Sequence, residues 1–466
     1  MPHNSVENLS WLPVLSKTMR PVYLAIAEAL AADILSGKLP GGTRLPPQRA
    51  LAAVLELDFT TISRAYAEAG KRGLVEGRVG QGTYVRDRAP APARAARSGV
   101  IDMSMNLPPH FDDPPLVSRM WRGIGGLEAS GGLDLLLQYQ EAGGTLADRT
   151  AGAAFLAARL PSVTPERVLI CPGAQGALLA VVLSLAAPGD IICVEELTYP
   201  GFRALAAHLG LQLAPVQMDR HGLLPEAFAA ACRSHQPKAL YCTPTLHNPT
   251  TATMPVERRE AIAGIARQYG VAVIEDDAYG ALPRQALPPL AVFAPELTYH
   301  VAGLAKCLSP ALRIAYVVPP DARMTARLAS AVRAMTSMAS PLTAAIATGW
   351  IQDGTAGAVI GAIRKETAAR LQLADAILPQ GLVQSHPDGF HLWMRLPAPW
   401  TRGELTSRLR AGGIGVVGSD AFAVTNPPEA VRLGLGAPES REELRQSLQI
   451  IADLLNAQPE MSGMVV

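Results

Sequence analysis

The stretch VAGLAKCLSPALR, residues 301–313, places Lys306 among small and apolar side chains, with Arg313 seven positions later. Lysine normally prefers water, so its position in an apolar run needs a physical reason. A desolvated lysine amine is nucleophilic and can hold a carbonyl compound as a Schiff base. Alternatively, a lysine at the end of a buried strand extends its ammonium group into solvent. Taken alone, the stretch favours a lysine that reaches into solvent. The residues upstream of it favour a lysine that forms a Schiff base.

Upstream and downstream of this stretch, strand-like apolar runs alternate with helical patterns. The runs cover residues 168–171, 191–194, 240–243, 271–274 and 314–318. Such alternation predicts an α/β fold with a mostly parallel sheet flanked by helices, and ligands bind such sheets at the carboxyl ends of the strands. The segment PGAQGA, residues 172–177, turns from a strand into a helix and presents free backbone amides that suit a phosphate.

The other candidate residues for chemistry also follow strands. Tyr199 lies in TYPG, Asn248 lies on a proline-fixed loop in TPTLHNPT, and EDDAYG supplies Asp276 and Tyr279. Taken singly, each also fits a structural role, because Asp276 can cap a strand end and Asn248 can form a turn before Pro249. Their common position after strands is therefore the stronger argument for one shared site.

The amino-terminal part of the chain has a different pattern. Apolar residues at helical spacing run over 21–37, a short helix is expected over 48–55, and Asp58 or Thr60 can cap a helix that runs to Lys71. Residues 73–85 alternate and turn on glycines, as a β-hairpin does. Three helices and a hairpin predict a winged helix, and a small domain that binds only protein is the alternative.

Composition limits the classes of protein that remain. The 466 residues are 49% hydrophobic and carry a net charge of +1, so any DNA binding must come from a local patch. Five cysteines without CxxC pairing and the lack of a leader-like start predict reduced thiols in a cytoplasmic protein. The longest apolar run, residues 177–187, is too short to span a bilayer. No HExxH or GxSxG motif occurs, so neither a metal site nor a serine hydrolase is expected.

Three segments of the amino-terminal part resemble the DNA-binding domain of GntR-family regulators. They are LPGGTRLPPQRALA (39–52), TTISRAY (60–66) and GQGTYV (80–85). The resemblance implies binding to a double-stranded DNA operator, with a recognition helix in the major groove. The residues that it assigns to DNA are Arg44, Arg49, Thr60, Thr61, Arg64, Gly80 and Gly82. Phe59 stands where relatives often carry a basic residue.

The remainder of the chain resembles fold-type I, aminotransferase-like enzymes that use pyridoxal 5'-phosphate. Together with the amino-terminal part, it is similar to the MocR subfamily of GntR regulators. The resemblance implies an aldimine between the cofactor and Lys306, with Asp276 pairing the pyridine nitrogen. It further implies that Asn248 and Tyr279 hydrogen-bond the ring oxygen of the cofactor, and that Tyr199 stacks on its ring.

The same resemblance assigns residues to the other parts of the site. Ala174, Gln175 and Arg313 are expected to hold the cofactor phosphate, and Arg432 in VRLG is expected to grip a substrate carboxylate. Tyr139 in QYQEAG matches the position from which the family contributes a tyrosine to the partner subunit. Relatives usually carry serines where this chain has Gly303 and Ala305, so we expect fewer phosphate contacts and a lower affinity for the cofactor.

Five segments are expected along the chain. They are a loose tail (1–18), a winged helix-turn-helix domain (19–88), an Ala/Pro/Arg linker (89–100), an aminotransferase-like arm and large domain (101–335), and a small domain (336–466). In the small domain we expect strands over 389–396 and 414–417 and helices over 402–410 and 440–455.

The leading hypothesis is a homodimeric, pyridoxal-phosphate-dependent transcription regulator that senses an amino compound at Lys306. One alternative is an active aminotransferase, since nearly all catalytic parts are present. Another is a regulator that senses pyridoxal phosphate itself and controls vitamin B6 synthesis. The sequence identifies neither the effector nor the operator.

Overall fold

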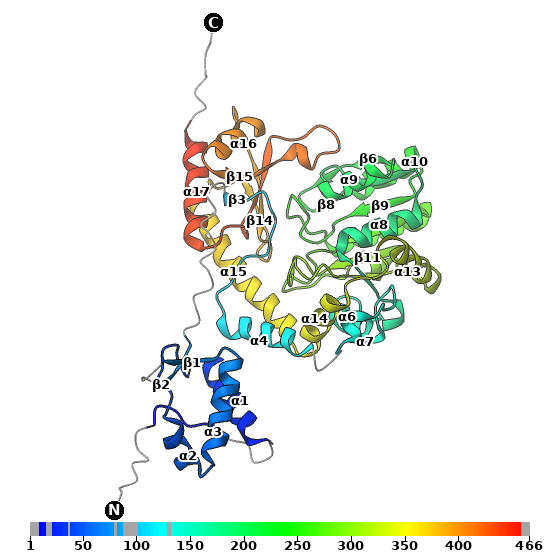
Figure 1. Ribbon diagram of the computed structural model, residues 1–466. Helices are drawn as coiled ribbons and strands as arrows, with labels where there is room; N and C mark the ends of the chain where they lie inside the picture. Colours follow the sequence, from blue (N-terminus) through cyan, green and yellow to red (C-terminus); the bar gives the residue numbers. More distant parts are fainter. Residues whose placement is uncertain are drawn as a thin grey trace, which may run out of the picture. The chain divides into compact units, whose positions relative to one another are not determined.

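The computed structural model describes residues 9–14, 21–35, 38–78, 82–86, 101–127 and 132–457. The chain divides into two compact units, Met1–Ser98 and Gly99–Val466. Each unit has its own hydrophobic core. Figure 1 shows the helices and strands of both units in sequence colours.

The first unit contains three helices and a hairpin, as the sequence predicts. The elements are α1 (Val22–Leu35), α2 (Gln48–Leu55), α3 (Phe59–Lys71), β1 (Val75–Arg78) and β2 (Gly82–Val85). Of the two predicted caps for the third helix, Asp58 is the one used, because its side chain accepts a hydrogen bond from the backbone N–H of Thr60 at 2.7 Å. The core of this unit is formed by residues that include Trp11, Ile26, Leu30, Leu51, Ile62 and Tyr66.

The second unit is built on a seven-stranded sheet. Its strands, in order across the sheet, are β4 (Leu169–Cys171), β12 (Ala315–Val318), β11 (Thr298–Gly303), β10 (Ala272–Asp276), β9 (Ala239–Cys242), β5 (Ile191–Glu195) and β6 (Gln212–Val216). β12 is antiparallel to both of its neighbours, and every other neighbouring pair is parallel. The sheet is therefore mostly parallel, in agreement with the α/β prediction.

Helices cover both faces of this sheet. Leu240 and Val273 pack on one face with α10 (Pro225–His235) and α11 (Val256–Tyr269), whereas Tyr241 and Ile274 pack on the other with α8 (Gly173–Leu185) and α13 (Ala322–Thr336). Strands buried on both faces read as continuous apolar runs, which is why the sequence reveals them. We call this sheet and its helices, including α7 (Leu146–Leu156), α9 (Pro200–His208) and α14 (Pro341–Gln352), the large lobe.

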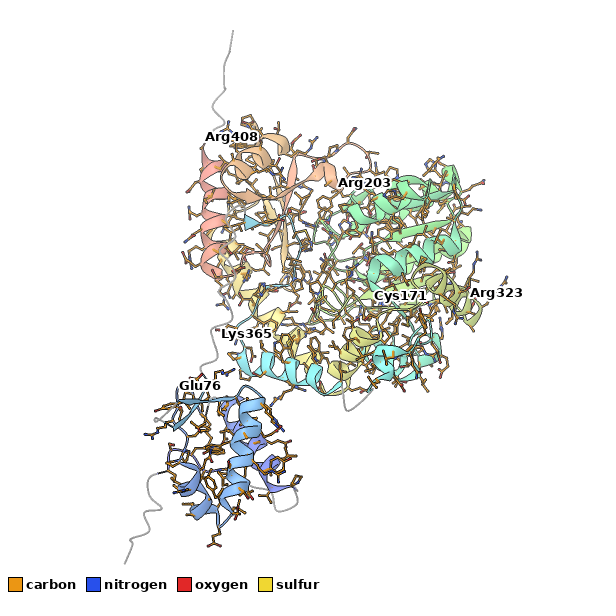
Figure 2. The ribbon with its side chains drawn as sticks, viewed as in Figure 1. Glu76, Cys171, Arg203, Arg323, Lys365 and Arg408 are labelled. Atoms are coloured by element: carbon orange, nitrogen blue, oxygen red, sulfur yellow. The ribbon has the colours of Figure 1, made fainter. Side chains whose placement is uncertain are left out.

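A second sheet forms the small lobe, with the strand order β13 (Val383–Gln384), β14 (His391–Arg395), β17 (Ala430–Gly434) and β16 (Val417–Gly418). The second half of α15 (Thr355–Ile377), α16 (Arg402–Ala411) and α17 (Arg441–Asn456) pack with it. Arg203 of α9 links the two lobes, since its guanidinium donates to the carbonyl oxygens of Asp420 and Ala421 at 3.1 and 2.6 Å (Figure 2).

The expected single strand over residues 414–417 is wrong. It is two short strands in different sheets: β16 pairs with β17, and β15 (Ile414–Gly415) pairs in parallel with β3 (Ile101–Asp102). The start of the second unit thus joins the small lobe, and the helix α14 that follows residue 336 packs into the large-lobe core through Trp350. Local sequence patterns do not encode a strand pairing across about 300 residues.

Two further properties follow from the burial of side chains. All five cysteines are buried and unpaired. Within the described ranges, no helix combines the length and the hydropathy that crossing a membrane requires.

Candidate functional site

A cavity of about 530 Å³ opens at the carboxyl ends of β4, β5, β9, β10 and β11. This is the edge of the sheet at which an α/β fold binds ligands. Nine residues named from the sequence line it: Ala174, Gln175, Tyr199, Asn248, Asp276, Tyr279, Lys306, Arg313 and Arg432. Residues separated by up to 258 positions along the chain therefore share one site.

Lys306 follows the buried strand β11 and carries an amine that is largely shielded from water. Its ammonium donates to the backbone carbonyl of Asn106. In the part of the chain that the structure describes, no carboxylate lies within 4 Å of this amine. Burial, reinforced by the nearby charge of Arg432, lowers the pKa of Lys306 to about 8, and the charge of Asp276 opposes that shift. The neutral, nucleophilic form is consequently accessible near neutral pH.

Asp276 is the last residue of β10 and is 5% exposed. Its Oδ2 accepts a hydrogen bond from the phenol of Tyr241 at 2.8 Å, while Oδ1 is buried without a hydrogen-bond partner among the described residues. Burial raises the pKa of Asp276 to about 6, and the Tyr241 hydrogen bond acts against this rise. A carboxylate with one free oxygen in a cavity suits a protonated ring nitrogen.

Asn248 is held in place by a buried arginine beneath its loop. Arg259 donates from Nε to the carbonyl of Met254 at 2.8 Å and from Nη2 to the carbonyl of Pro244 at 3.0 Å, and so it ties both ends of the loop to α11. The Asn248–Pro249 peptide bond is cis. His247, the preceding residue, is engaged by Thr250 and Glu195 and does not line the cavity.

The beginning of α8 forms a cradle for an anion. Gly173 has φ +76°, and the free backbone amides of Ala174 and Gln175 lie at the amino terminus of a 13-residue helix. The guanidinium of Arg313 lies close by, since a Cβ on Gly173 would be 3.6 Å from it. Gly303 adds no hydroxyl group here, and a Cβ at this position would come within 3.2 Å of Ala174.

Arg432 is 6% exposed in β17 of the small lobe, so it is no surface residue. Nη1 donates to Oδ1 of Asn248 at 2.9 Å, Nη2 donates to the carbonyl of Ser104, and the guanidinium lies 5.2 Å from the Phe422 ring centre. Among the described side chains, no carboxylate lies within 4 Å of it. A buried cation without a counter-charge favours an anionic ligand, and a guanidinium matches a carboxylate in a bidentate way.

Two parts of the site were not identified from the sequence, because no motif marks them. Residues 104–107 line the cavity, and Asn106 donates from Nδ2 to the phenol oxygen of Tyr279 at 2.7 Å. Tyr241, behind Asp276, is the other contribution. Both depend on contacts between distant parts of the chain, which local sequence patterns do not reveal. For Tyr241, the one available signal was a single tyrosine within an apolar strand.

Tyr139 does not join the cavity of its own chain. It is 85% exposed, and large apolar side chains near it in the sequence are exposed too. These side chains, which we call the apolar arm surface, are Trp121, Leu133, Leu136, Leu137, Tyr139 and Leu146. Where exposed apolar side chains form a contiguous patch, they mark an interaction surface.

In the first unit, the residues named for DNA binding lie around the start of α3 and the hairpin. Arg44, Arg49, Thr60 and Arg64 are exposed and Thr61 is half-buried. The guanidinium of Arg64 lies 4.7 Å from the Tyr23 ring centre, and that of Arg49 lies 5.9 Å from the ring centre of Phe59. Gly82 has φ +109°, and a Cβ there would come within 3.2 Å of Arg44. Gly80 lies outside the described residues.

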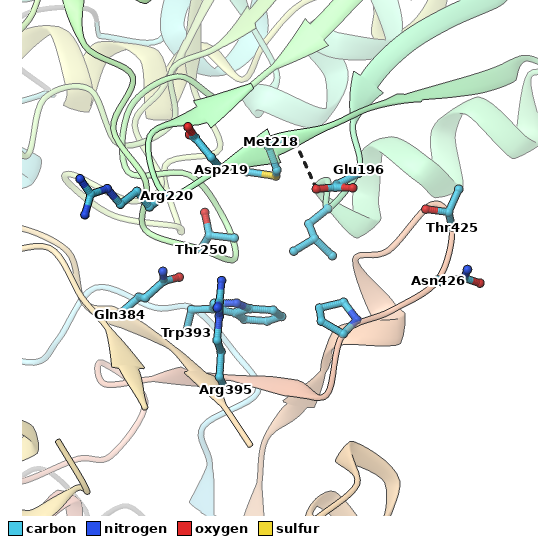
Figure 3. Close-up of a pocket in the computed structure, with 12 residues that line it drawn as sticks. Glu196, Met218, Asp219, Arg220, Thr250, Gln384, Trp393, Arg395, Thr425 and Asn426 are labelled. Atoms are coloured by element: carbon cyan, nitrogen blue, oxygen red, sulfur yellow. Dashed lines mark hydrogen bonds between the residues drawn. The ribbon is translucent and has the colours of Figure 1, made fainter. Parts of the chain in front are cut away.

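A second cavity, of about 290 Å³, lies between the two lobes. Glu196, Met218 and Asp219 of the large lobe face Trp393 and Arg395 of the small lobe across it (Figure 3). Glu196 accepts a hydrogen bond from the backbone N–H of Met218 at 3.2 Å. This cavity contains none of the candidate residues from the sequence. Within the described ranges, no group of three or more His, Cys, Asp or Glu side chains is arranged to hold a metal ion.

Comparison with known families and proteins agrees with this division of the chain. Residues 22–85 match the gntR family of bacterial regulatory proteins, and residues 100–451 match the aminotransferase class I and II family. The uncharacterized HTH-type transcriptional regulator YdeF of Bacillus subtilis is 34% identical over 98% of this chain and 99% of its own length.

Other regulators are more distantly similar to this chain. The vitamin B6 salvage pathway transcriptional repressor PtsJ of Salmonella typhimurium is 25% identical over 90% of this chain and 95% of its own. The probable rhizopine catabolism regulatory protein MocR of Rhizobium meliloti is 26% identical over 64% and 66%. Among solved structures, the α-aminoadipate aminotransferase LysN of Thermus thermophilus superposes with a TM-score of 0.68 at 24% identity, over 77% of this chain and 92% of that one.

Proposed function

Since this chain is a transcription regulator of the MocR type, in which a GntR-family helix-turn-helix precedes an aminotransferase class I and II domain, we propose that it binds pyridoxal 5'-phosphate at Lys306 and senses an amino compound there. The observation that carries the proposal is the lowered pKa of Lys306 in a cavity shared with Asp276 and Arg432. In this proposal, binding of the amino compound changes how the regulator reads a double-stranded DNA operator.

The residues of the cavity fit this cofactor. Asp276 Oδ1, buried and without a partner among the described atoms, suits the ring nitrogen. The amides of Ala174 and Gln175, with Arg313, suit the phosphate. When bound, pyridoxal phosphate supplies an aldehyde carbon and a ring that accepts electrons from an attached amine. Asn248 and Tyr279 lie in the same cavity as donors for the ring oxygen, and Tyr199 as a ring to stack on it.

We infer the chemical class of the effector from Arg432. Its buried guanidinium has no carboxylate partner among the described side chains, so an amino compound that also carries a carboxylate would satisfy it. Such a ligand competes with the carbonyl of Ser104 and the amide of Asn248 for the guanidinium. We propose that this competition moves residues 104–107, which are separated from the expected linker (89–100) in the sequence only by residues 101–103.

The apolar arm surface supports the proposal of a homodimer. A second copy of the chain would remove these side chains from water, and it would offer Tyr139 to a cavity other than its own. Sedimentation of the full-length protein and of its Trp121→Asp variant tests this directly. We expect a dimer for the first and a weakened dimer for the second, with Ile450→Asp, an exposed residue of α17, as the unchanged control.

Operator binding tests the proposal as a whole. DNA fragments selected from the region upstream of the gene would be titrated with protein alone, with pyridoxal phosphate, and with both cofactor and a panel of amino acids. We expect the cofactor-loaded protein to change its DNA affinity when one class of amino compound is added, and Lys306→Ala to lose the response. A response to pyridoxal phosphate alone, unaffected by any amine, would contradict amine sensing.

A response to pyridoxal phosphate alone would support the second candidate function, in which the protein senses the cofactor itself. It is favoured by the relative PtsJ, whose name is that of a vitamin B6 salvage repressor. Catalytic turnover is a third outcome, because Lys306, Asp276 and Arg432 all line the cavity. Rapid multiple turnover of amino donors with 2-oxoglutarate, without any effect on DNA affinity, would favour an enzyme.

A further inference from the structure

Asp276 is held from behind by a tyrosine of the neighbouring strand. We propose that Tyr241 is a positioning residue, which keeps the Asp276 carboxylate ionised and aimed at the ring nitrogen of the cofactor. This inference rests on the proposed binding of pyridoxal phosphate in this cavity. It assigns a role to a residue that does not line the cavity and acts on the ligand only through Asp276.

The register of the sheet brings the two side chains together. Tyr241 of β9 is paired with Ile274 of β10, two residues before Asp276. Because side chains alternate between faces of a strand, Ile274 and Asp276 point to the same face, and a long phenol from Tyr241 can reach along that face. The Tyr241 hydroxyl donates to Asp276 Oδ2 at 2.8 Å and leaves Oδ1 free for the ligand.

The phenol is itself fixed in place. Its ring is stacked on Phe202 of α9, with ring centres 3.7 Å apart and an interplanar angle of 6°. Tyr241 is also completely buried. The direction of the hydrogen bond to Asp276 is therefore set before any ligand arrives.

The electrostatic surroundings of Asp276 explain why this bond matters. Burial raises the pKa of the carboxyl group and the negative charge of Glu195 adds to the rise, whereas the backbone N–H of Ala278 and the charge of Lys306 lower it. Tyr199, Tyr279 and Cys242 are the other titratable groups that interact with Asp276. Against burial, the Tyr241 hydrogen bond is the largest opposing influence on this pKa. A hydrogen bond to a charged group shifts an equilibrium by about tenfold or more.

A Tyr241→Phe substitution distinguishes a positioning role from a purely structural one. Phenylalanine keeps the ring that stacks on Phe202 and the bulk that fills the core, and it removes only the donor. Without the donor, the pKa of Asp276 rises further, so ionisation of the carboxylate is lost at a higher pH as the pH falls. Packing alone would give an effect that does not depend on pH.

The test measures the affinity of the full-length protein for pyridoxal phosphate by absorbance titration across pH, for wild type and Tyr241→Phe. We expect the ratio of the two dissociation constants to be about ten at acidic pH, below the pKa of Asp276, and to fall toward one above about pH 8. Using the ratio cancels the titration of Lys306 and of the cofactor, which both proteins share. The matched control is Tyr299→Phe, a buried phenol of the next strand that we expect to leave the affinity unchanged at every pH.

A double-mutant cycle separates positioning from general disturbance. In an Asp276→Asn background there is no carboxylate to ionise, so Tyr241→Phe should change the cofactor affinity less than twofold. A ratio that does not vary with pH, an equal effect of Tyr299→Phe, or an undiminished effect in the Asp276→Asn background would overturn the inference. If wild type binds no cofactor at all, the proposed function fails as well, and the two failures are thereby distinguished.

Discussion

Nη1 of Arg432 donates a hydrogen bond to Oδ1 of Asn248 over 2.9 Å, and this bond joins β17 of the small lobe to the loop after β9 of the large lobe. Both residues line the cavity, and each is expected to bind a different part of the ligand. A ligand carboxylate that takes Arg432 must share the guanidinium with Asn248 or displace it. We therefore expect the position of the small lobe to depend on what occupies the cavity.

Arg432 should discriminate amines by their carboxylate. In Arg432→Met, we expect the response of DNA affinity to an α-amino acid to need at least about tenfold more ligand, because a charge-assisted pair is lost. The response to the corresponding amine without a carboxylate should change little. The measurement is a titration with matched pairs of amino acid and amine, and Arg395→Met, an exposed arginine of β14, serves as the control. Equal losses for both members of a pair would contradict the role of Arg432.

The pKa of Lys306 predicts how fast the protein takes up pyridoxal phosphate. Only the neutral amine is nucleophilic, and burial lowers its pKa to about 8. The rate of uptake should therefore rise as the pH is raised through about 8 and level off above it. Because the charge of Asp276 raises this pKa, Asp276→Asn should move the midpoint to lower pH. Stopped-flow absorbance at several pH values measures both, and a midpoint near that of an exposed lysine, about 10.4, would contradict the account.

A buried cluster stabilises the second unit. Arg159 is paired with Asp277, and His300 lies 3.4 Å from the same carboxylate and 3.1 Å from that of Glu275. Replacing one partner leaves a buried charge without compensation, so Arg159→Met should lower the free energy of unfolding by about 3–5 kcal/mol. Urea unfolding followed by tryptophan fluorescence measures this.

Two comparisons make this prediction specific. The double variant Arg159→Met/Asp277→Leu should be more stable than Arg159→Met alone, since no charge remains unpaired. The exposed pair of Arg267 and Glu296 should contribute only about 0–1 kcal/mol, so Arg267→Ala is the control. A double variant as unstable as the single one would show that the cluster does not act as a charge pair.

Arg49 should contribute to DNA binding without reading sequence. Its side chain is exposed and lies close to Phe59 of α3. The loss of a phosphate contact weakens binding to all DNA sequences alike. For Arg49→Ala we expect lower affinity for every DNA fragment and a fall of about one in the slope of log affinity against log salt. Arg323→Ala, an exposed arginine of the second unit, should leave that slope unchanged. Loss of discrimination between fragments with an unchanged salt slope would contradict a phosphate contact.

Elements that depend on local patterns could be predicted from the sequence. The helix over 48–55 has the bounds of α2, because its start after Pro47 and its apolar spacing are both local features. Five of the seven strands of the large sheet, β4, β5, β9, β10 and β12, were visible as apolar runs, and the candidate polar residues do meet in one cavity. β6 and β11 went unpredicted, although β11 leads directly to Lys306.

Contacts between distant segments could not be predicted. The pairing of β3 with β15, the approach of Asn106 to Tyr279, and the hydrogen bond from Tyr241 to Asp276 all depend on tertiary structure. Arg432 could be named only through a family resemblance, since its burial arises from the packing of two lobes. The contribution of Tyr139 to a partner stays a prediction.

The most direct test of the central claim is to locate the lysine that holds the cofactor. The protein would be incubated with pyridoxal phosphate, treated with borohydride and digested, and the modified peptide identified by mass spectrometry. The other lysines, Lys17, Lys38, Lys71, Lys238 and Lys365, serve as internal controls. We predict near-complete modification of Lys306 at one equivalent of cofactor. Modification spread over the other lysines, with Lys306 unmodified, would contradict the account.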